Sequence, residues 1–201
     1  MKLPIPVELT RILTETPELG DAYLVGGCVR DALLGEAIAA ALEGLARRHP
    51  GHVAITVGYD EGLSHLGYAA SDFTLVPSRF EPCGLNQMYS QRYGTPPLVH
   101  ATGGLLDTVV DCTPATLADG SASGFLFHTM TPGNFLAAIR RVSIAYRDKP
   151  VWRRLQKNGM AKDFSWRLSA AAYREIYLSL LSRPSKQTHA NPVAARQKRK
   201  A

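Results

Sequence analysis

The chain has few cysteines and no long apolar segment. Its three cysteines, Cys28, Cys83 and Cys112, are widely spaced and include no Cys-x-x-Cys pair, which argues against a disulfide framework and a zinc cluster. No uninterrupted apolar run approaches the roughly 20 residues of a membrane-spanning helix. Residues 1–6 also lack the apolar core of a signal peptide. We therefore expect reduced thiols, no metal site and a soluble protein of the cytoplasm.

Acidic residues are absent after Ser182. The stretch 183–201 carries six of the 23 lysine and arginine residues, two prolines and almost nothing that could be buried. The preceding body has 17 basic and 17 acidic residues, so the formal net charge of +6 belongs to the end of the chain. We expect 183–201 to form a disordered basic tail and 36–182 to form one main domain, preceded by a separate fragment at 1–35. Neither a membrane nor a nucleic acid is favoured as a partner of the balanced body.

Helix and strand signals alternate through the middle of the chain. Strands are predicted at 52–57, 72–76, 98–100 and 124–127, and helices at 36–49, 60–69, 85–93, 104–110, from Thr131, at 152–157 and at 166–181. Thr131 is the expected N-cap of its helix, with Pro132 in the first turn, and 111–123 has the composition of a loop. This order predicts an α/β fold, a Rossmann-like three-layer arrangement with helices on both faces of a parallel sheet.

A carboxylate, a glycine turn and a helix start follow one another at 81–86. Helix N-termini present free amides and about half a positive charge, so the amides of Leu85 and Asn86, with the Asn86 side chain, could hold a diphosphate. Gly84 would allow close approach. Glu81 lies at the carboxyl end of a predicted parallel strand, where ligands usually bind, and could accept hydrogen bonds from sugar hydroxyls. Cys83 could equally be a small residue packed in a tight turn.

Three ordered motifs resemble the donor-binding half of bacterial glycogen and starch synthases: Gly58-Tyr59-Asp60-Glu61, Glu81-Pro82-Cys83-Gly84-Leu85-Asn86 and Thr102-Gly103-Gly104. The resemblance covers about 36–182 and implies the C-terminal half of a GT-B glycosyltransferase, a retaining enzyme that uses ADP-glucose and needs no cofactor.

The resemblance also implies roles for individual residues. Glu81, the candidate catalytic residue, would line the glucose together with Cys83 and Gly84. Leu85 and Asn86 would meet the distal phosphate and Tyr59 the adenine. For Thr102, Gly103 and Gly104, donor-binding amides and a plain turn are equal alternatives.

Other features depart from that family. Its first lobe, which carries the glucan acceptor groove, has no counterpart here, so the chain alone is expected to be inactive. His100-Ala101 stands where two basic residues are usual, and Leu66 where an arginine commonly follows the histidine.

Residues 22–35 resemble instead the start of tRNA nucleotidyltransferases and bacterial poly(A) polymerases, where a Gly-Gly pair such as 26–27 holds a triphosphate. The Asp-x-Asp pair that this chemistry needs for two Mg²⁺ ions does not follow. The alternatives to a synthase lobe are a non-catalytic nucleotide-sugar-binding module and an RNA-binding protein that uses the Gly-Gly segment and the basic tail.

Overall fold

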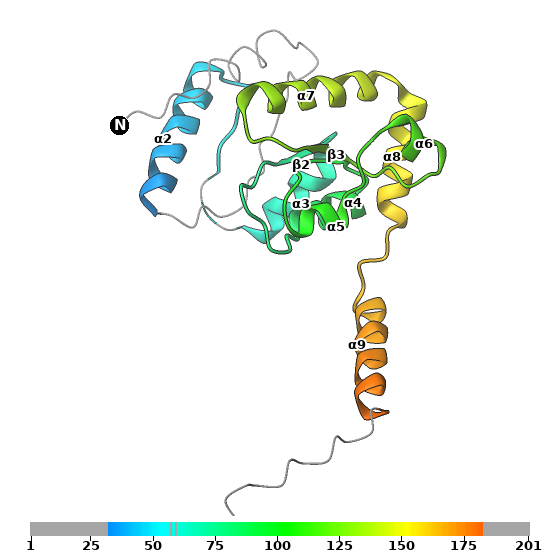
Figure 1. Ribbon diagram of the computed structural model, residues 1–201. Helices are drawn as coiled ribbons and strands as arrows, with labels where there is room; N and C mark the ends of the chain where they lie inside the picture. Colours follow the sequence, from blue (N-terminus) through cyan, green and yellow to red (C-terminus); the bar gives the residue numbers. More distant parts are fainter. Residues whose placement is uncertain (1–31, 57, 59, 183–201) are drawn as a thin grey trace, which may run out of the picture. The chain divides into compact units, whose positions relative to one another are not determined.

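The computed structural model describes residues 32–56, 58 and 60–182 (Figure 1). Residues 22–31 of the nucleotidyltransferase-like segment, Tyr59 and the basic tail at 183–201 lie outside the described residues. The chain divides into two compact units between Lys162 and Asp163. The first unit contains the sheet, and the second contains helix α9 (Trp166–Leu181). Among the described residues, no helix is long and apolar enough to span a membrane.

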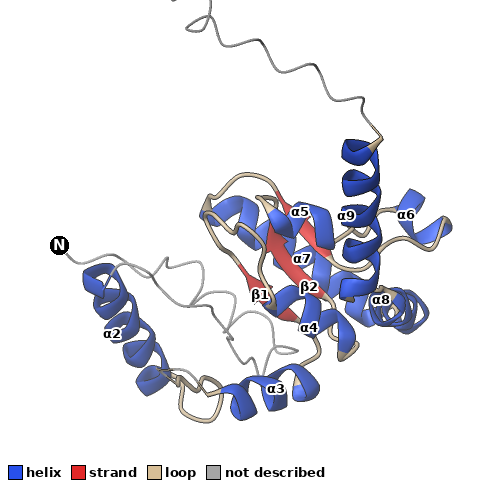
Figure 2. Ribbon diagram, turned by 90° about the horizontal axis from the view of Figure 1, so that it is seen from below, coloured by secondary structure: helices blue, strands red, loops and turns tan. Residues whose placement is uncertain are grey.

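The first unit is built around a three-stranded parallel sheet. Its elements in chain order are α2 (Ala32–Arg48), α3 (Glu61–Ala70), β1 (Thr74–Val76), α4 (Asn86–Arg92), β2 (Pro97–His100), α5 (Gly104–Thr108), α6 (Pro114–Ala118), β3 (Phe125–Phe127), α7 (Pro132–Arg147) and α8 (Lys149–Ala161). The strand order is β1-β2-β3, so β2 is central. Leu98 of β2 is paired with Leu75 of β1 and Phe125 of β3. All three carboxyl ends therefore meet at one edge of the sheet (Figure 2, strands in red).

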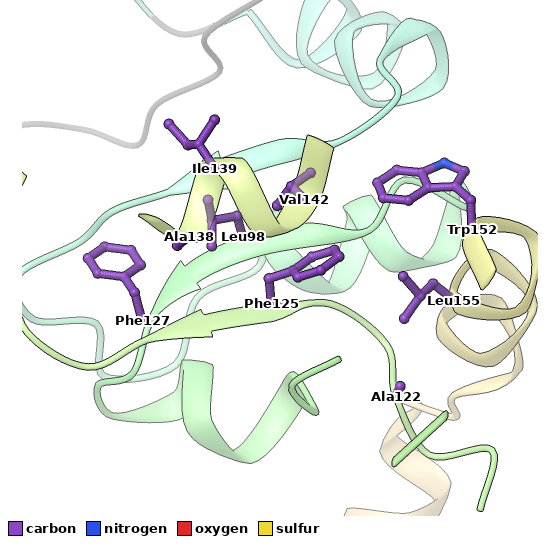
Figure 3. Close-up of a cluster of buried hydrophobic side chains, with 9 residues drawn as sticks. All are labelled: Leu98, Ala122, Phe125, Phe127, Ala138, Ile139, Val142, Trp152 and Leu155. Atoms are coloured by element: carbon purple, nitrogen blue, oxygen red, sulfur yellow. The ribbon is translucent and has the colours of Figure 1, made fainter. Parts of the chain in front are cut away.

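Separate apolar clusters cover the two faces of the sheet. On one face, Leu98, Phe125 and Phe127 pack with buried residues of α7, of α8 and of the segment that precedes β3 (Figure 3). These residues are Ala122, Ala138, Ile139, Val142, Trp152 and Leu155. On the other face, Val76 and Val99 pack with Leu105 and Val109. In Figure 1, α7 lies on one side of the sheet and α3, α4 and α5 lie on the other. The predicted three-layer α/β arrangement is confirmed.

Local capping chemistry explains where several helices begin. Asp60 accepts a hydrogen bond from the Leu63 amide at the start of α3, and Thr131 accepts one from the Asn134 amide at the start of α7. Pro132 lies in the first turn of α7, where its missing N–H costs nothing. The predicted starts of these two helices are confirmed.

Two predictions of secondary structure are wrong. Residues 53–56 form no strand, although Val53 is buried, because no neighbouring strand in the described part of the chain pairs with them. The predicted loop 111–123 contains α6, which begins at a capping box between Thr113 and Thr116. The usual sequence signature of a capping box has Glu or Gln three residues after the N-cap, and here that residue is Thr116. The sequence pattern therefore did not predict this helix.

Helix α2 starts earlier than predicted, and helix α8 extends beyond its predicted range at both ends, to Lys149 and Ala161. Helix α8 starts well before Trp152, at Lys149, where the Asp148 side chain accepts a hydrogen bond from the Val151 amide. Helix α2 starts at Ala32 rather than Glu36, so it runs across position 35 without interruption.

Candidate functional site

Two loops meet at the carboxyl edge of the sheet. The loop after β1 contains Glu81 and Cys83, and the loop after β2 contains Gly103 and Gly104. The Gly104 amide donates a 3.0 Å hydrogen bond to the carbonyl oxygen of Glu81. A Cβ atom on Gly103 would lie 2.1 Å from that same oxygen, and one on Gly104 would lie 2.5 Å from the Cys83 carbonyl oxygen. Only glycine allows this contact, which brings residues of two sequence motifs into one site.

The Glu81 side chain is partly exposed and is held by a short chain of hydrogen bonds. The Ser78 hydroxyl donates to Glu81 Oε2 at 3.3 Å. The Ser78 carbonyl oxygen lies 2.8 Å from Nδ1 of His100, the last residue of β2. The His100 ring in turn packs 5.3 Å from that of Phe127. Glu81 is thus linked through Ser78 to the central strand β2 and stays partly exposed.

Gly84 turns the chain from the Glu81 loop into α4. Its φ is 75°, in the region that favours glycine, and an added Cβ would lie 2.5 Å from Gln87 Oε1. Gln87 is fully buried, and its Nε2 donates to the carbonyl oxygens of Cys83 and Gly84, both at 3.0 Å, and to Thr108 Oγ1 at 3.1 Å. Gln87 is not among the residues that the sequence motifs predict for the site. Its spacing of four from the equally buried Gln91 is the signal that both face inward.

The start of α4 is uncapped. Leu85 occupies the N-cap position, supplies no side-chain acceptor and is 56% exposed. Within the described part of the chain, no group accepts a hydrogen bond from the amides of Leu85 or Asn86. By contrast, α3, α6, α7 and α8 are each capped by an Asp or Thr side chain, whereas α5 and α9 also lack a side-chain cap bond. Helix α4 therefore begins with free donors beside the Glu81 carboxylate.

The Asn86 side chain has a defined orientation. Its Oδ1 accepts a 2.9 Å hydrogen bond from the Tyr68 hydroxyl. Its Nδ2 donates to no group among the residues that the structure describes. Burial raises the pKa of Tyr68, and the negative charge that Tyr89 would carry raises it further, so the hydroxyl stays protonated and able to donate. The Asn86 amide therefore adds a further free donor to those of the backbone.

The other residues predicted for the site are in the loop after β2, at Cys83 and at Tyr59. The Gly104 amide is already bonded to Glu81, and the Leu105 amide donates to the Thr102 carbonyl oxygen at 3.1 Å, so this second loop has the geometry of a turn. The Cys83 thiol is free and exposed. The candidate adenine contact, Tyr59, lies outside the described residues. Across the described ranges, no three His, Cys, Asp or Glu residues are grouped as a metal site would require.

Charges close to the site are few. Arg79, which precedes Glu81, is exposed and makes no ion pair with any described residue. Lys162 donates from Nζ to the Thr108 carbonyl oxygen at 2.8 Å, at the C-terminal end of α5, and burial lowers its pKa. The site therefore offers backbone and side-chain amide donors at the start of α4 and a carboxylate a few residues away.

The sequence was compared with those of known proteins. No protein-family model matches the chain. It is 58% identical over 174 residues to the glycogen synthase of Nitrosospira multiformis, an alignment covering 87% of this chain and 34% of that protein. It is 60% identical over 153 residues to the glycogen synthase of Nitrosomonas eutropha, covering 76% and 30%. The chain is homologous to part of a glycogen synthase. It spans about a third of the length of these relatives.

Solved structures give the same result for the fold. The catalytic domain of starch synthase IV from Arabidopsis thaliana, bound to ADP and acarbose, superposes with a TM-score of 0.71 at 39% identity, covering 88% of this chain and 36% of that one. Sucrose-phosphate synthase from Thermosynechococcus elongatus superposes with a TM-score of 0.59 at 24% identity and covers 88% and 42%. The second likeness concerns the fold alone. The chain has the α/β fold of a GT-B glycosyltransferase lobe, as predicted.

Proposed function

We propose that the chain is the donor-binding lobe of a retaining, ADP-glucose-dependent α-1,4-glucan synthase. The observation that carries this proposal is the uncapped start of α4, whose free donors lie one short turn from Glu81. A nucleotide sugar has a matching order of groups, an anionic diphosphate next to a hydroxyl-rich hexose. The homology to glycogen synthases and the likeness to a starch synthase that binds ADP support the choice of donor.

Each residue of the site has a role in this proposal. The amides of Leu85 and Asn86, with Asn86 Nδ2, hold the distal phosphate, helped by the positive end of the α4 dipole. Glu81 accepts hydrogen bonds from glucose hydroxyls, and Cys83 and Gly84 line the sugar. Gly103 and Gly104 pack against the backbone of the Glu81 loop, and Thr102 accepts the hydrogen bond that closes their turn. Tyr59 contacts the adenine.

The proposed reaction breaks the bond between the glucose anomeric carbon and the phosphate oxygen. A hydroxyl of the glucan acceptor forms the new bond to that carbon, on the same face of the sugar, and passes its proton to the departing phosphate oxygen. Negative charge grows on the departing ADP, and the donors at the start of α4 stabilise it because they are already oriented before reaction. The proposal needs no metal ion or cofactor.

The isolated chain is expected to bind donor weakly and to transfer no glucose. It spans about a third of its relatives, and the acceptor groove is assigned to a further lobe that would close over the donor. A non-catalytic nucleotide-sugar-binding module is the second candidate, because the same free donors and the Glu81 carboxylate could bind a nucleotide sugar without transferring it. The resemblance of 22–35 to tRNA nucleotidyltransferases, RNA binding and a cytoplasmic location all stay predictions.

Calorimetric titration of the full chain with ADP and ADP-glucose tests the proposal. We expect binding of both, weakened about fivefold or more in Asn86→Ala through loss of hydrogen bonding to a charged group. Asn134→Ala, which changes an asparagine in the first turn of α7, is the matched control and should bind like the wild type. Absence of ADP binding by the wild type at millimolar concentration would refute the donor-lobe assignment.

A second assay separates the two candidates. Incorporation of labelled glucose into glucan is measured with the chain alone and with a separately supplied first lobe of a related synthase. Activity only in the mixture supports a synthase lobe, whereas binding without activity in either sample favours the non-catalytic module. Elongation by the chain alone would contradict the expectation that it is catalytically incomplete.

A further inference from the structure

Tyr68 connects the donor site to a cluster of aromatic rings between α3 and α4. The ring is almost completely buried, at 3% exposure, and lies 6.3 Å from that of Tyr93 and 6.2 Å from that of Tyr89. His65 completes the cluster, with Nδ1 3.1 Å from the Tyr93 hydroxyl. Out of this apolar setting, the Tyr68 hydroxyl reaches Asn86 Oδ1, 18 positions further along the chain.

The backbone of Tyr68 is fixed as firmly as its ring. The hydroxyl of Thr95, itself buried, donates to the Tyr68 carbonyl oxygen at 2.7 Å and also to that of Ser71 at 3.2 Å. These bonds join the last turn of α3 to the segment between α4 and β2. Because both ends of the residue are held, its hydroxyl has little freedom to follow a rotating partner.

The orientation of Asn86 matters because the two ends of its amide have opposite functions. The oxygen accepts hydrogen bonds and would repel a phosphate, whereas the nitrogen donates two and would bind it. The two ends are nearly equal in shape, so sterics alone do not select between them. A fixed donor on the oxygen side does select, and it leaves the nitrogen for the ligand.

We propose that Tyr68 is a positioning residue for the donor, whose hydroxyl holds the Asn86 amide so that Nδ2 is presented to the distal phosphate. This inference rests on the proposed function, since it assumes that a diphosphate binds at the start of α4. It adds a residue of α3 that touches no ligand group and acts only through Asn86.

The test compares ADP with AMP, which lacks the distal phosphate. In the full chain, Tyr68→Phe removes the hydroxyl and keeps the ring in its cluster. We expect ADP affinity to fall about three- to tenfold, the range for one hydrogen bond, and AMP affinity to stay unchanged. Tyr93→Phe removes the neighbouring hydroxyl, which bonds His65 and not Asn86, and should alter neither affinity.

A double-mutant cycle shows whether Tyr68 acts through Asn86. In the Asn86→Ala background, Tyr68→Phe should cause no further loss of ADP affinity, because no amide is left to orient. Equal weakening of ADP and AMP, an undiminished effect in that background, or no effect on ADP would each overturn the inference while the donor-lobe assignment stands. Failure of the wild-type chain to bind ADP would overturn both.

Discussion

Substitution of Gly103 by alanine tests whether the contact between the two loops is required. Gly103 has φ 46° and ψ −136°, a conformation almost confined to glycine, which costs about 1–3 kcal/mol for other residues. The new Cβ would also lie 2.1 Å from the Glu81 carbonyl oxygen, whereas carbon and oxygen atoms normally approach to about 3.3 Å. The loops must separate by roughly 1 Å, which breaks or weakens the bond from Gly104 to Glu81. We expect a loss of about 2–4 kcal/mol in the free energy of unfolding.

Two other glycines separate the causes of this loss. Gly120 has φ 80° but no atom within 4 Å of an added Cβ, so Gly120→Ala should show the conformational cost alone, about 1 kcal/mol. Gly133, in the first turn of α7, has neither a positive φ nor a close neighbour. Gly133→Ala should therefore cause no loss and could stabilise the helix by about 0.5 kcal/mol.

Urea unfolding followed by tryptophan fluorescence measures these differences. The chain has two tryptophans, and Trp166 is 78% exposed, so a Trp166→Phe background leaves the buried Trp152 as the reporter of the core. Titration of the same variants with ADP-glucose should show weaker binding only for Gly103→Ala, because only this change displaces the Glu81 loop, which is proposed to bind the glucose. Equal stability of Gly103→Ala and Gly120→Ala would refute the argument that the loop contact needs glycine.

Further measurements test the charge and thiol environment. In a Cys28→Ser background, iodoacetamide should alkylate the exposed Cys83 quickly and Cys112 slowly, because burial and the neighbouring Asp111 raise the pKa of Cys112. Saturating ADP-glucose should lower the alkylation rate of Cys83 only, and mass spectrometry of the peptides measures both rates. An unchanged rate at Cys83 would argue against a sugar at that position. Asp111→Ala should lower the unfolding free energy by about 1–3 kcal/mol, because this carboxylate accepts from both the Leu126 amide and Arg141, while Glu175→Ala, which removes an exposed ion pair in α9, should change it by less than about 0.5 kcal/mol. Equal effects of the two acid substitutions would contradict this account.

The sequence predicted those features of the site that depend on neighbouring residues. The glycine turn before α4, the Thr131 cap and the apolar central strand are local patterns, and each is confirmed by the structure. Two ordered motifs also implied that Glu81 and Gly103 belong to one site. In the second loop, the Gly104 amide is bonded to the Glu81 carbonyl oxygen, while donor binding by this loop stays a prediction.

Features that depend on distant partners were not predictable in this way. Gln87 bonds Thr108, 21 positions away, and Tyr68 bonds Asn86, 18 positions away. Nothing in the local sequence around a glutamine or tyrosine indicates which polar group will lie opposite it after folding. The strand prediction at 52–57 fails for the same reason. Alternating apolar residues favour a strand, but a strand forms only where a partner strand is available to pair with it.

The way helices begin in this protein separates stability from function. A Ser, Thr, Asp or Asn at an N-cap typically contributes about 0.5–2 kcal/mol relative to an apolar residue, and α3, α6, α7 and α8 all have one. Helix α4 has Leu85 instead, and the turn before it depends on a buried Gln87 whose Oε1 accepts no hydrogen bond from any described group. A side-chain cap at Leu85 would bond the amide of Gln87 or Met88 and place its acceptor beside the amides of Leu85 and Asn86, and an acidic cap would repel a phosphate. Helices α5 and α9 also begin without a side-chain cap bond, but the start of α4 combines this departure from the local rule with an exposed turn next to the Glu81 carboxylate, which suits the proposed binding of an anionic ligand.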